Sequence, residues 1–324
     1  MKTFNILLAA ALATCWGCAG FASAQSYPAK AVRIVVPQAP GGASDALARI
    51  IGQRLSDRWH QPVVVENRAG AGGLIGTDQV AKSAADGYTL LLAYDGTHAV
   101  NASLYKSLPF DPLKDFTAVA TLANVPFVLA VNAASPSKDV KDFVERARAS
   151  PGRLTYGSAG NGSVNHLLGA MFGKGAGVQL VHVPYKGAAP AITDLIGGSV
   201  DAVFSSIPSV VGHIQSGRVR ALGVTSGKRS AALPNVPTIA ESGLSGFDVA
   251  PWFGLLAPAA TPADIVQKIN DDIAALLLTK DVIDAFAAQG AEPFASKPAA
   301  FGAILRTDID KWAVVVRESG AKID

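Results

Sequence analysis

Two glycine-rich stretches, each lying between a predicted strand and a predicted helix, constrain this chain more than any other feature. The first, residues 37–45 (PQAPGGASD), follows the apolar run Val32–Val36, and the second, residues 156–163 (YGSAGNGS), precedes an apolar helical pattern over 164–172. The first turn of a helix has unpaired N–H groups, and the helix dipole favours negative charge there, so each loop predicts an anion site. Neither loop contains Lys or Arg, and neither fits the Gly-Lys-Ser/Thr ending of a P-loop. The pair predicts two lobes that face one small anion.

The first residues have the pattern of an export signal. Lys2 is followed by the short apolar run 4–13, and Ala22-Ser23-Ala24 fits a small-x-small cleavage site, so residues 1–24 are predicted to be a signal peptide. Both cysteines of the chain, Cys15 and Cys18, lie in this segment. A lipid anchor on one of them is the alternative to cleavage after Ala24. The expected location is the periplasm.

Composition is typical of a globular protein that does not bind nucleic acid. The formal charge is +3, and Lys and Arg are scattered without a run or stripe, which argues against nucleic-acid binding. The mature chain would lack cysteine, so burial alone must stabilise it.

Strand-like runs alternate with helical patterns twice along the chain, which predicts an α/β fold with mostly parallel sheets. The first series includes 32–36, 63–65 and 89–93 as strands, and the second includes 154–156, 179–183, 202–205 and 221–225. Crossings between lobes are expected near 121–126 and 225–230, where each series closes. Residues 25–122 plus 226–324 would then form one lobe and residues 123–225 the other, with a hinge between them.

Several loops offer neutral hydrogen-bond donors to the expected crevice, although each also reads as an ordinary capped turn. Gly41 and Gly42 permit close backbone approach, and Ser44 or Asp45 would cap the next helix. Open α/β sheets bind ligands at the carboxyl ends of their strands, so the pairing of the loops favours function over a mere turn. His166, in the second helix, reads more readily as a structural residue than as a ligand.

Enzyme and metal signatures are weak in the linear sequence. Tyr156 stands where a nucleophile elbow around Ser158 would need its first glycine. The five histidines show no metal-ligand spacing, and no cofactor motif is complete, so no cofactor is expected.

An ordered series of motifs resembles one family over essentially the whole mature chain. The motifs are PxxPGGxxD at 37–45, NRxGAGG at 67–73, DGYTL at 86–90, YGSxGxGS at 156–163, VPYKG at 183–187 and WFGLLAP at 252–258. Together they resemble the Bug receptors, the TctC-like extracytoplasmic solute-binding proteins of tripartite tricarboxylate transporters. The resemblance implies a two-lobe, Venus-flytrap periplasmic binding fold of type II that holds a small carboxylate between its lobes.

The resemblance also implies the site, formed largely by backbone amides. The expected ligand-binding residues are Gly41, Gly42, Ala43, Ser44, Asp45, Gly72, Gly73 and Thr97 in the first lobe and Ser158, Gly160, Asn161, Gly162, Ser163 and Asn165 in the second. The loops lack cationic side chains, which favours a mono- or dicarboxylate over a tricarboxylate. The expected partners are membrane transporter subunits, and the receptor itself is expected to be a monomer.

Two other functions stay open at this point. One is a receptor that reports to a sensor kinase instead of a transporter. The other is an exported small-acid enzyme on the same fold, with Ser163 or His166 as acid or base.

Overall fold

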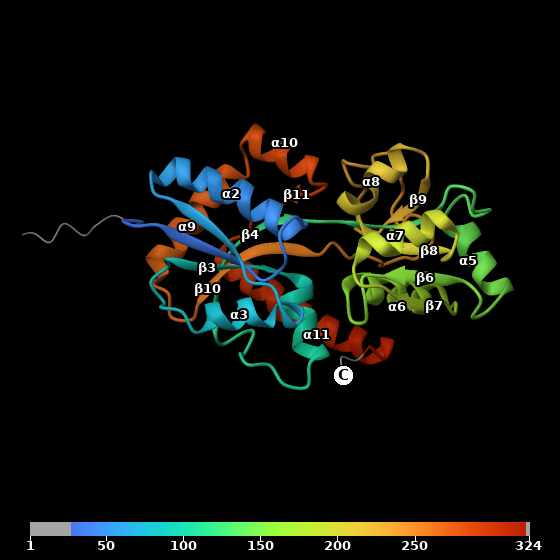
Figure 1. Ribbon diagram of the computed structural model, residues 1–324, viewed down its shortest axis with the longest axis horizontal. Coiled ribbons are helices and arrows are strands. Elements are labelled where there is room, and N and C mark those ends of the chain that lie inside the picture. Colours follow the sequence, from blue (N-terminus) through green and yellow to red (C-terminus); the bar gives the residue numbers. More distant parts are fainter. Residues whose placement is uncertain (1–26, 322–324) are drawn as a thin grey trace, which may run out of the picture.

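The computed structural model describes residues 27–321, which form two lobes, each built around a mixed β-sheet with flanking helices (Figure 1). The predicted two-lobe α/β fold is therefore confirmed. The predicted signal peptide, residues 1–24, lies outside the described residues. Within the described part of the chain, no helix has the length and apolar character needed to cross a membrane.

The first sheet has the strand order β11-β4-β10-β3-β1-β2. Strands β1, β2, β3 and β4 run in one direction, whereas β10 and β11 run against them. β10 is reversed because it carries the chain back from the second lobe. The elements of this lobe are β1 (Val32–Val36), α2 (Ala43–Trp59), β2 (Val63–Asn67), η1 (Ala71–Gly73), α3 (Leu74–Ala81), β3 (Thr89–Tyr94), the π-helix η2 (Gly96–Val100), α4 (Asn101–Leu104), β4 (Phe116–Asn124), β10 (Trp252–Pro258), α9 (Ala263–Leu276), α10 (Lys280–Ala288), β11 (Glu292–Pro293) and α11 (Pro298–Ser319).

The second sheet has the order β7-β6-β8-β5-β9, in which only β5 is reversed among the described strands. Its elements are β5 (Phe127–Asn132), α5 (Val140–Ala149), β6 (Thr155–Ser158), α6 (Val164–Ala176), β7 (Val181–Pro184), α7 (Ala188–Gly197), β8 (Ala202–Ser206), α8 (Ile207–Gln215) and β9 (Val219–Val224).

Continuous apolar runs form the central strands because helices cover both faces of each sheet. In β1, Ile34 packs in the cluster on one face, together with Leu47 of α2, and Val35 packs in the cluster on the other face. A strand buried on both faces is apolar at successive positions rather than alternating with polar residues, as Ile34, Val35 and Val36 are in β1.

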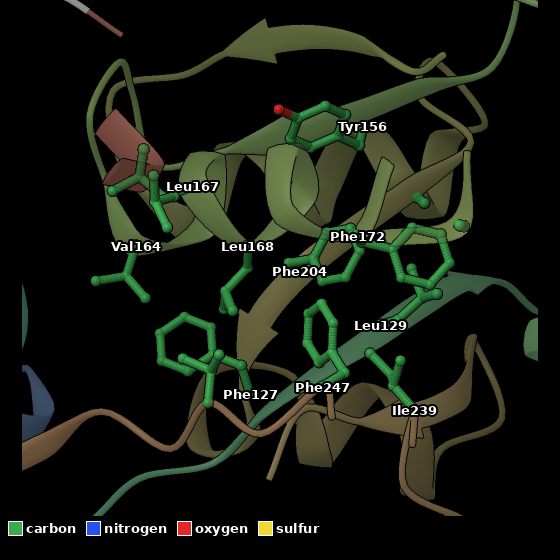
Figure 2. Packing of buried hydrophobic residues seen from close by; sticks show 14 of the residues in the cluster. Phe127, Leu129, Tyr156, Val164, Leu167, Leu168, Phe172, Phe204, Ile239 and Phe247 are labelled. Atoms are coloured by element: carbon green, nitrogen blue, oxygen red, sulfur yellow. The ribbon is translucent and has the colours of Figure 1, made fainter. Parts of the chain in front are cut away.

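One core cluster of the second lobe contains several aromatic side chains and extends to the C-terminal helix. Phe172 of α6 packs against Phe204 of β8 and against Phe247, and all three belong to one cluster with several leucines (Figure 2). The same cluster contains Trp312 of α11, which is fully buried. α11 thus begins beside the first sheet and ends against α6 of the second lobe (Figure 1).

The chain crosses between the lobes after β4 and again before β10. The first crossing lies at 125–126, as predicted. Residues 226–250 stay with the second lobe beyond the expected return near 225–230, since Ile239 and Phe247 are part of its core and Val249 N donates to Thr225 O at 2.8 Å. The return therefore lies at 250–251 rather than near 225–230, so residues 226–249 pack with residues 123–225 and not with the first lobe as predicted.

Candidate functional site between the lobes

Sheet topology brings the strand-to-helix loops of the two lobes face to face. β4 leaves the first lobe at Asn124, and because β1 and β3 run parallel to it, their carboxyl ends lie at the same edge. β5 enters the second lobe at Phe127, which pairs with Ser206 at the carboxyl end of β8, so the ends of β6 and β8 face back toward the first lobe. The two loops singled out in the sequence thus lie on facing edges (Figure 1).

A cavity of about 140 Å³ lies where these edges meet. No lining residue carries a formal charge. Its walls come from both lobes, with Gly72, Tyr94, Gly96, Asn101, Leu104 and Tyr105 on one side and Asn161, Gly162, Ser163 and Val164 on the other. Four of the predicted site residues therefore line it: Gly72, Asn161, Gly162 and Ser163.

The Gly72 wall is tied to η2 and α4. Asn101 Nδ2 donates to Gly72 O at 2.9 Å. Gly73 has φ +96°, and a Cβ there would lie 2.8 Å from Thr97 Cγ2, so only glycine allows this close approach. Gly73 and Thr97 pack against each other next to Gly72 and do not line the cavity themselves.

The start of α2 presents backbone donors. The helix begins at Ala43, earlier than expected, and the predicted side-chain cap by Ser44 or Asp45 is wrong, since Gly42 is the N-cap and no side chain caps the helix. Asp45 instead accepts from Gly41 N at 3.1 Å and pairs with Arg49 at 2.9 Å. Burial acts to raise the pKa of Asp45, but these bonds lower it overall. Its carboxylate is therefore an ionised structural group.

The backbone amides at this helix start lack acceptors. Among residues 27–321, the amides of Gly42, Ala43 and Ser44 have no hydrogen-bond partner. Gly41 and Gly42 are exposed, and these residues do not line the 140 Å³ cavity. The helix start offers anion-binding donors after β1, at the same edge of the first sheet as the carboxyl end of β3.

The second-lobe loop uses several of its polar groups internally. The Gly160 amide donates to Ser158 Oγ at 3.0 Å, the Gly162 amide to His166 Nδ1 at 3.2 Å, and the Ser163 amide to Gly160 O at 3.2 Å. The expectation that these three amides are available to a ligand therefore does not hold in this conformation, because the tight turn consumes them.

Three side chains of this segment are structural as well. Ser163 Oγ accepts from His166 N at 3.3 Å and so caps α6. Asn165 Nδ2 donates to Phe204 O at 2.8 Å, which ties α6 to β8. Ser158 is fully buried and bonds to His182. The helix and its loop are thus rigidly joined to the sheet.

Two carboxyl groups, the buried Asp95 and the half-buried Asp308, influence each other's charge, and Asp95 adjoins the cavity lining in the chain. Asp95, between the lining residues Tyr94 and Gly96, accepts from Trp312 Nε1 at 2.7 Å, and Asp308 accepts from Trp252 Nε1 at 2.8 Å. Burial and the negative charge of Asp308 raise the pKa of Asp95 to about 8. Asp95 is therefore largely protonated at neutral pH and adds little negative charge that would repel an anion.

Sequence reasoning left out of the predicted site several residues that line the cavity, notably Tyr94, Leu104 and Tyr105. Leu104 and Tyr105 lie beyond the π-helix η2, which has no sequence signature. Tyr94 directly follows the strand predicted over 89–93, and that position was a usable signal. Residues 27–321 contain no cluster of His, Cys, Asp or Glu able to hold a metal ion.

Known proteins match this chain over most of its length. The model of the tripartite tricarboxylate transporter family receptor, TctC, matches residues 47–321. The chain is 43% identical over 308 residues to protein BugT of Bordetella pertussis, covering 95% of this chain and 94% of that protein.

Two solved structures resemble it over nearly their full length. R. palustris Rpa4515 with adipate has a TM-score of 0.82 at 38% identity, covering 92% of this chain and 100% of that one. MatC from Rhodopseudomonas palustris with bound malate has a TM-score of 0.76 at 34% identity, covering 90% and 100%. The sequence resemblance is confirmed: the chain belongs to the TctC family of tripartite tricarboxylate transporter receptors.

Proposed function

We propose that this receptor binds a small mono- or dicarboxylate between its lobes, in the periplasm, and delivers it to membrane transporter subunits. The observation that carries the proposal is the 140 Å³ cavity, whose walls come from both lobes and carry no formal charge. Relatives with adipate and with malate support the carboxylate class. Both walls belong to one chain, so we propose that a monomer is sufficient for binding.

The unpartnered amides at the start of α2 are the proposed carboxylate donors. An ionised acceptor strengthens such hydrogen bonds, and closure of the lobes would exclude water and strengthen them further. Ser44 and Gly42 flank Ala43, so one carboxylate can accept from neighbouring amides of this turn. Loss of one bond to a charged group would cost about 2 kcal/mol, or roughly thirtyfold in affinity.

The enzyme alternative finds no support in the geometry of its two residues. Ser163 caps α6, and its hydroxyl donates to Gly160 O at 2.7 Å. His166 Nδ1 is occupied by the Gly162 amide. Both side chains hold the loop in place rather than projecting unpartnered groups into the cavity.

Ala43→Pro tests the proposed donors. Ala43 is the first helical residue of α2, a position that tolerates proline, and Gly42 has φ −89° and ψ 177°, which suit a residue before proline. The variant therefore deletes one amide donor and keeps the helix. Lys280→Pro makes the same change at the exposed first residue of α10 and is the matched control.

Calorimetric titration with adipate and malate gives the readout, and native mass spectrometry of the purified protein identifies any acid already bound. Ala43→Pro should weaken binding roughly thirtyfold, whereas Lys280→Pro should leave it unchanged. Equal affinity in both variants would rule out the start of α2 as the carboxylate site. Failure of the unaltered protein to bind any mono- or dicarboxylate would refute the ligand class.

A further inference from the structure

Two histidines lie stacked directly behind the second-lobe loop. His166 comes from the first turn of α6 and His182 from β7, and their rings are 3.7 Å apart between centroids with an interplanar angle of 6°. His166 is 6% exposed. Neither residue lines the cavity, so neither can contact a ligand there directly.

Each ring makes one hydrogen bond to the loop. His166 Nδ1 accepts from the Gly162 amide at 3.2 Å, so this nitrogen carries no proton. His182 Nε2 lies 2.6 Å from Ser158 Oγ. Since the Ser158 hydroxyl already donates to Gly160 O at 3.1 Å, His182 is assigned as the donor to the serine oxygen.

The surroundings keep both rings neutral. Burial lowers the pKa of His166. Burial, and then repulsion between His182 and a protonated His166, lower the pKa of His182 to about 4. Tyr156 of β6 packs against both rings. Among the described residues neither histidine forms a salt bridge, and the charged pair that joins α6 to α11, Lys174 with Glu318, lies at the opposite end of α6.

Gly162 lies between the histidine pair of its own lobe and helix α4 of the first lobe. Its φ is +72°, and a Cβ at this position would collide with Leu104 of α4. The residue is therefore held between His166 in its own lobe and Leu104 across the cavity. A loop that loses the His166 acceptor would leave the buried Gly162 amide unpaired, and it would move to find a new partner.

We propose that His166, supported by His182, is a positioning residue that holds the Gly160–Ser163 loop in its ligand-binding conformation through the Gly162 amide. The proposal rests on the proposed function, since the loop forms one wall of the carboxylate cavity. The neutral Nδ1 acts as a fixed acceptor, and its stacked partner keeps the ring in one orientation.

His166→Asn and His166→Leu form the matched test pair. The two replacements have nearly the same size and both lose the ring stack, but the Asn oxygen can accept from the Gly162 amide and Leu cannot. Hydrogen exchange of the Gly162 amide, measured by NMR on the ligand-free protein, reports the bond. Calorimetric titration with adipate and malate reports its consequence for binding.

Gly162 should stay protected from exchange in His166→Asn and lose protection in His166→Leu. The affinity should fall at least tenfold in His166→Leu, or about 1.4 kcal/mol, and stay within about threefold of the unaltered protein in His166→Asn. Equal exchange in both variants, or equal affinity despite different exchange, would overturn the proposal. If the unaltered protein binds no acid, the proposed function fails, and Gly162 exchange alone still decides whether His166 holds the loop.

A second pair of variants, at His182, keeps the proposal testable if the variants at position 166 do not fold. His182→Gln keeps a donor for Ser158, whereas His182→Met does not. The same readouts should then separate His182→Gln from His182→Met in the same direction, and no difference between them would remove His182 from the proposal.

Discussion

We expect the free energy of unfolding of the unaltered protein to fall as pH rises toward 8, because Asp95 then loses a proton. Asp95→Asn should remove this fall. Asp95 is 3% exposed and its pKa is raised to about 8, mainly by burial and then by the charge of Asp308. The folded protein keeps a proton that the unfolded chain releases above about pH 4. The stabilising contribution is therefore fully present at low pH and is lost as pH rises toward 8.

The slope follows from linkage. One proton held only by the folded state changes the free energy of unfolding by about 1.4 kcal/mol per pH unit, so the loss between pH 6 and 8 is about 2 kcal/mol as the slope flattens near the pKa. Asn keeps the oxygen that accepts from Trp312 Nε1 and has no proton to lose. The variant should therefore be about 2 kcal/mol less sensitive to pH over this range.

Urea unfolding at pH 6, 7 and 8, followed by tryptophan fluorescence, measures the effect. Asp308→Asn removes the neighbouring charge and should shift the loss toward lower pH, while Asp284→Asn, on the exposed face of α10, should leave the slope unchanged. Parallel curves for Asp95→Asn and the unaltered protein would show that Asp95 is already ionised at pH 6, and the argument from burial would be wrong.

Two further changes probe the second-lobe loop. Gly162→Ala should weaken adipate or malate binding more than tenfold in calorimetry because its methyl group meets Leu104, and adding Leu104→Ala should recover part of the loss; no recovery would mean that the φ of +72° alone sets the cost. Ser163→Ala removes the cap of α6 and should lower the free energy of unfolding in urea by about 1 kcal/mol, and an unchanged midpoint would show that the cap contributes nothing.

Local elements of this fold can be predicted from the chain alone. The run Val32–Val36 was expected as a strand and forms one with the same bounds, because four of its five residues are β-branched and buried. The glycine-rich motif at 67–73 likewise ends where helix α3 begins, at Leu74. Helix α2, by contrast, starts at Ala43 without a side-chain cap, because Asp45 pairs with Arg49 and the Gly41 amide.

The sequence predicted which loops form the candidate site, but not which of their backbone amides are available to a ligand. Sequence motifs placed Gly72 and Asn161–Ser163 at a site, and these residues line the cavity. Which amides would remain available could not be read from the sequence. The Gly162 amide is consumed by His166, whose ring reaches it only because the turn folds back onto α6.

Packing between residues far apart in the chain determined how the local elements are arranged. The sequence by itself specified two strand-helix alternations and the glycines at their loops, because those depend on periodicity and local backbone freedom. Tertiary structure alone decided that α11 would span both lobes, that Leu104 would meet Gly162, and that Asp95 would lie buried against Trp312. These contacts join residues far apart in the chain. Their energies depend on which side chains are buried against one another, and a local sequence pattern does not contain that information.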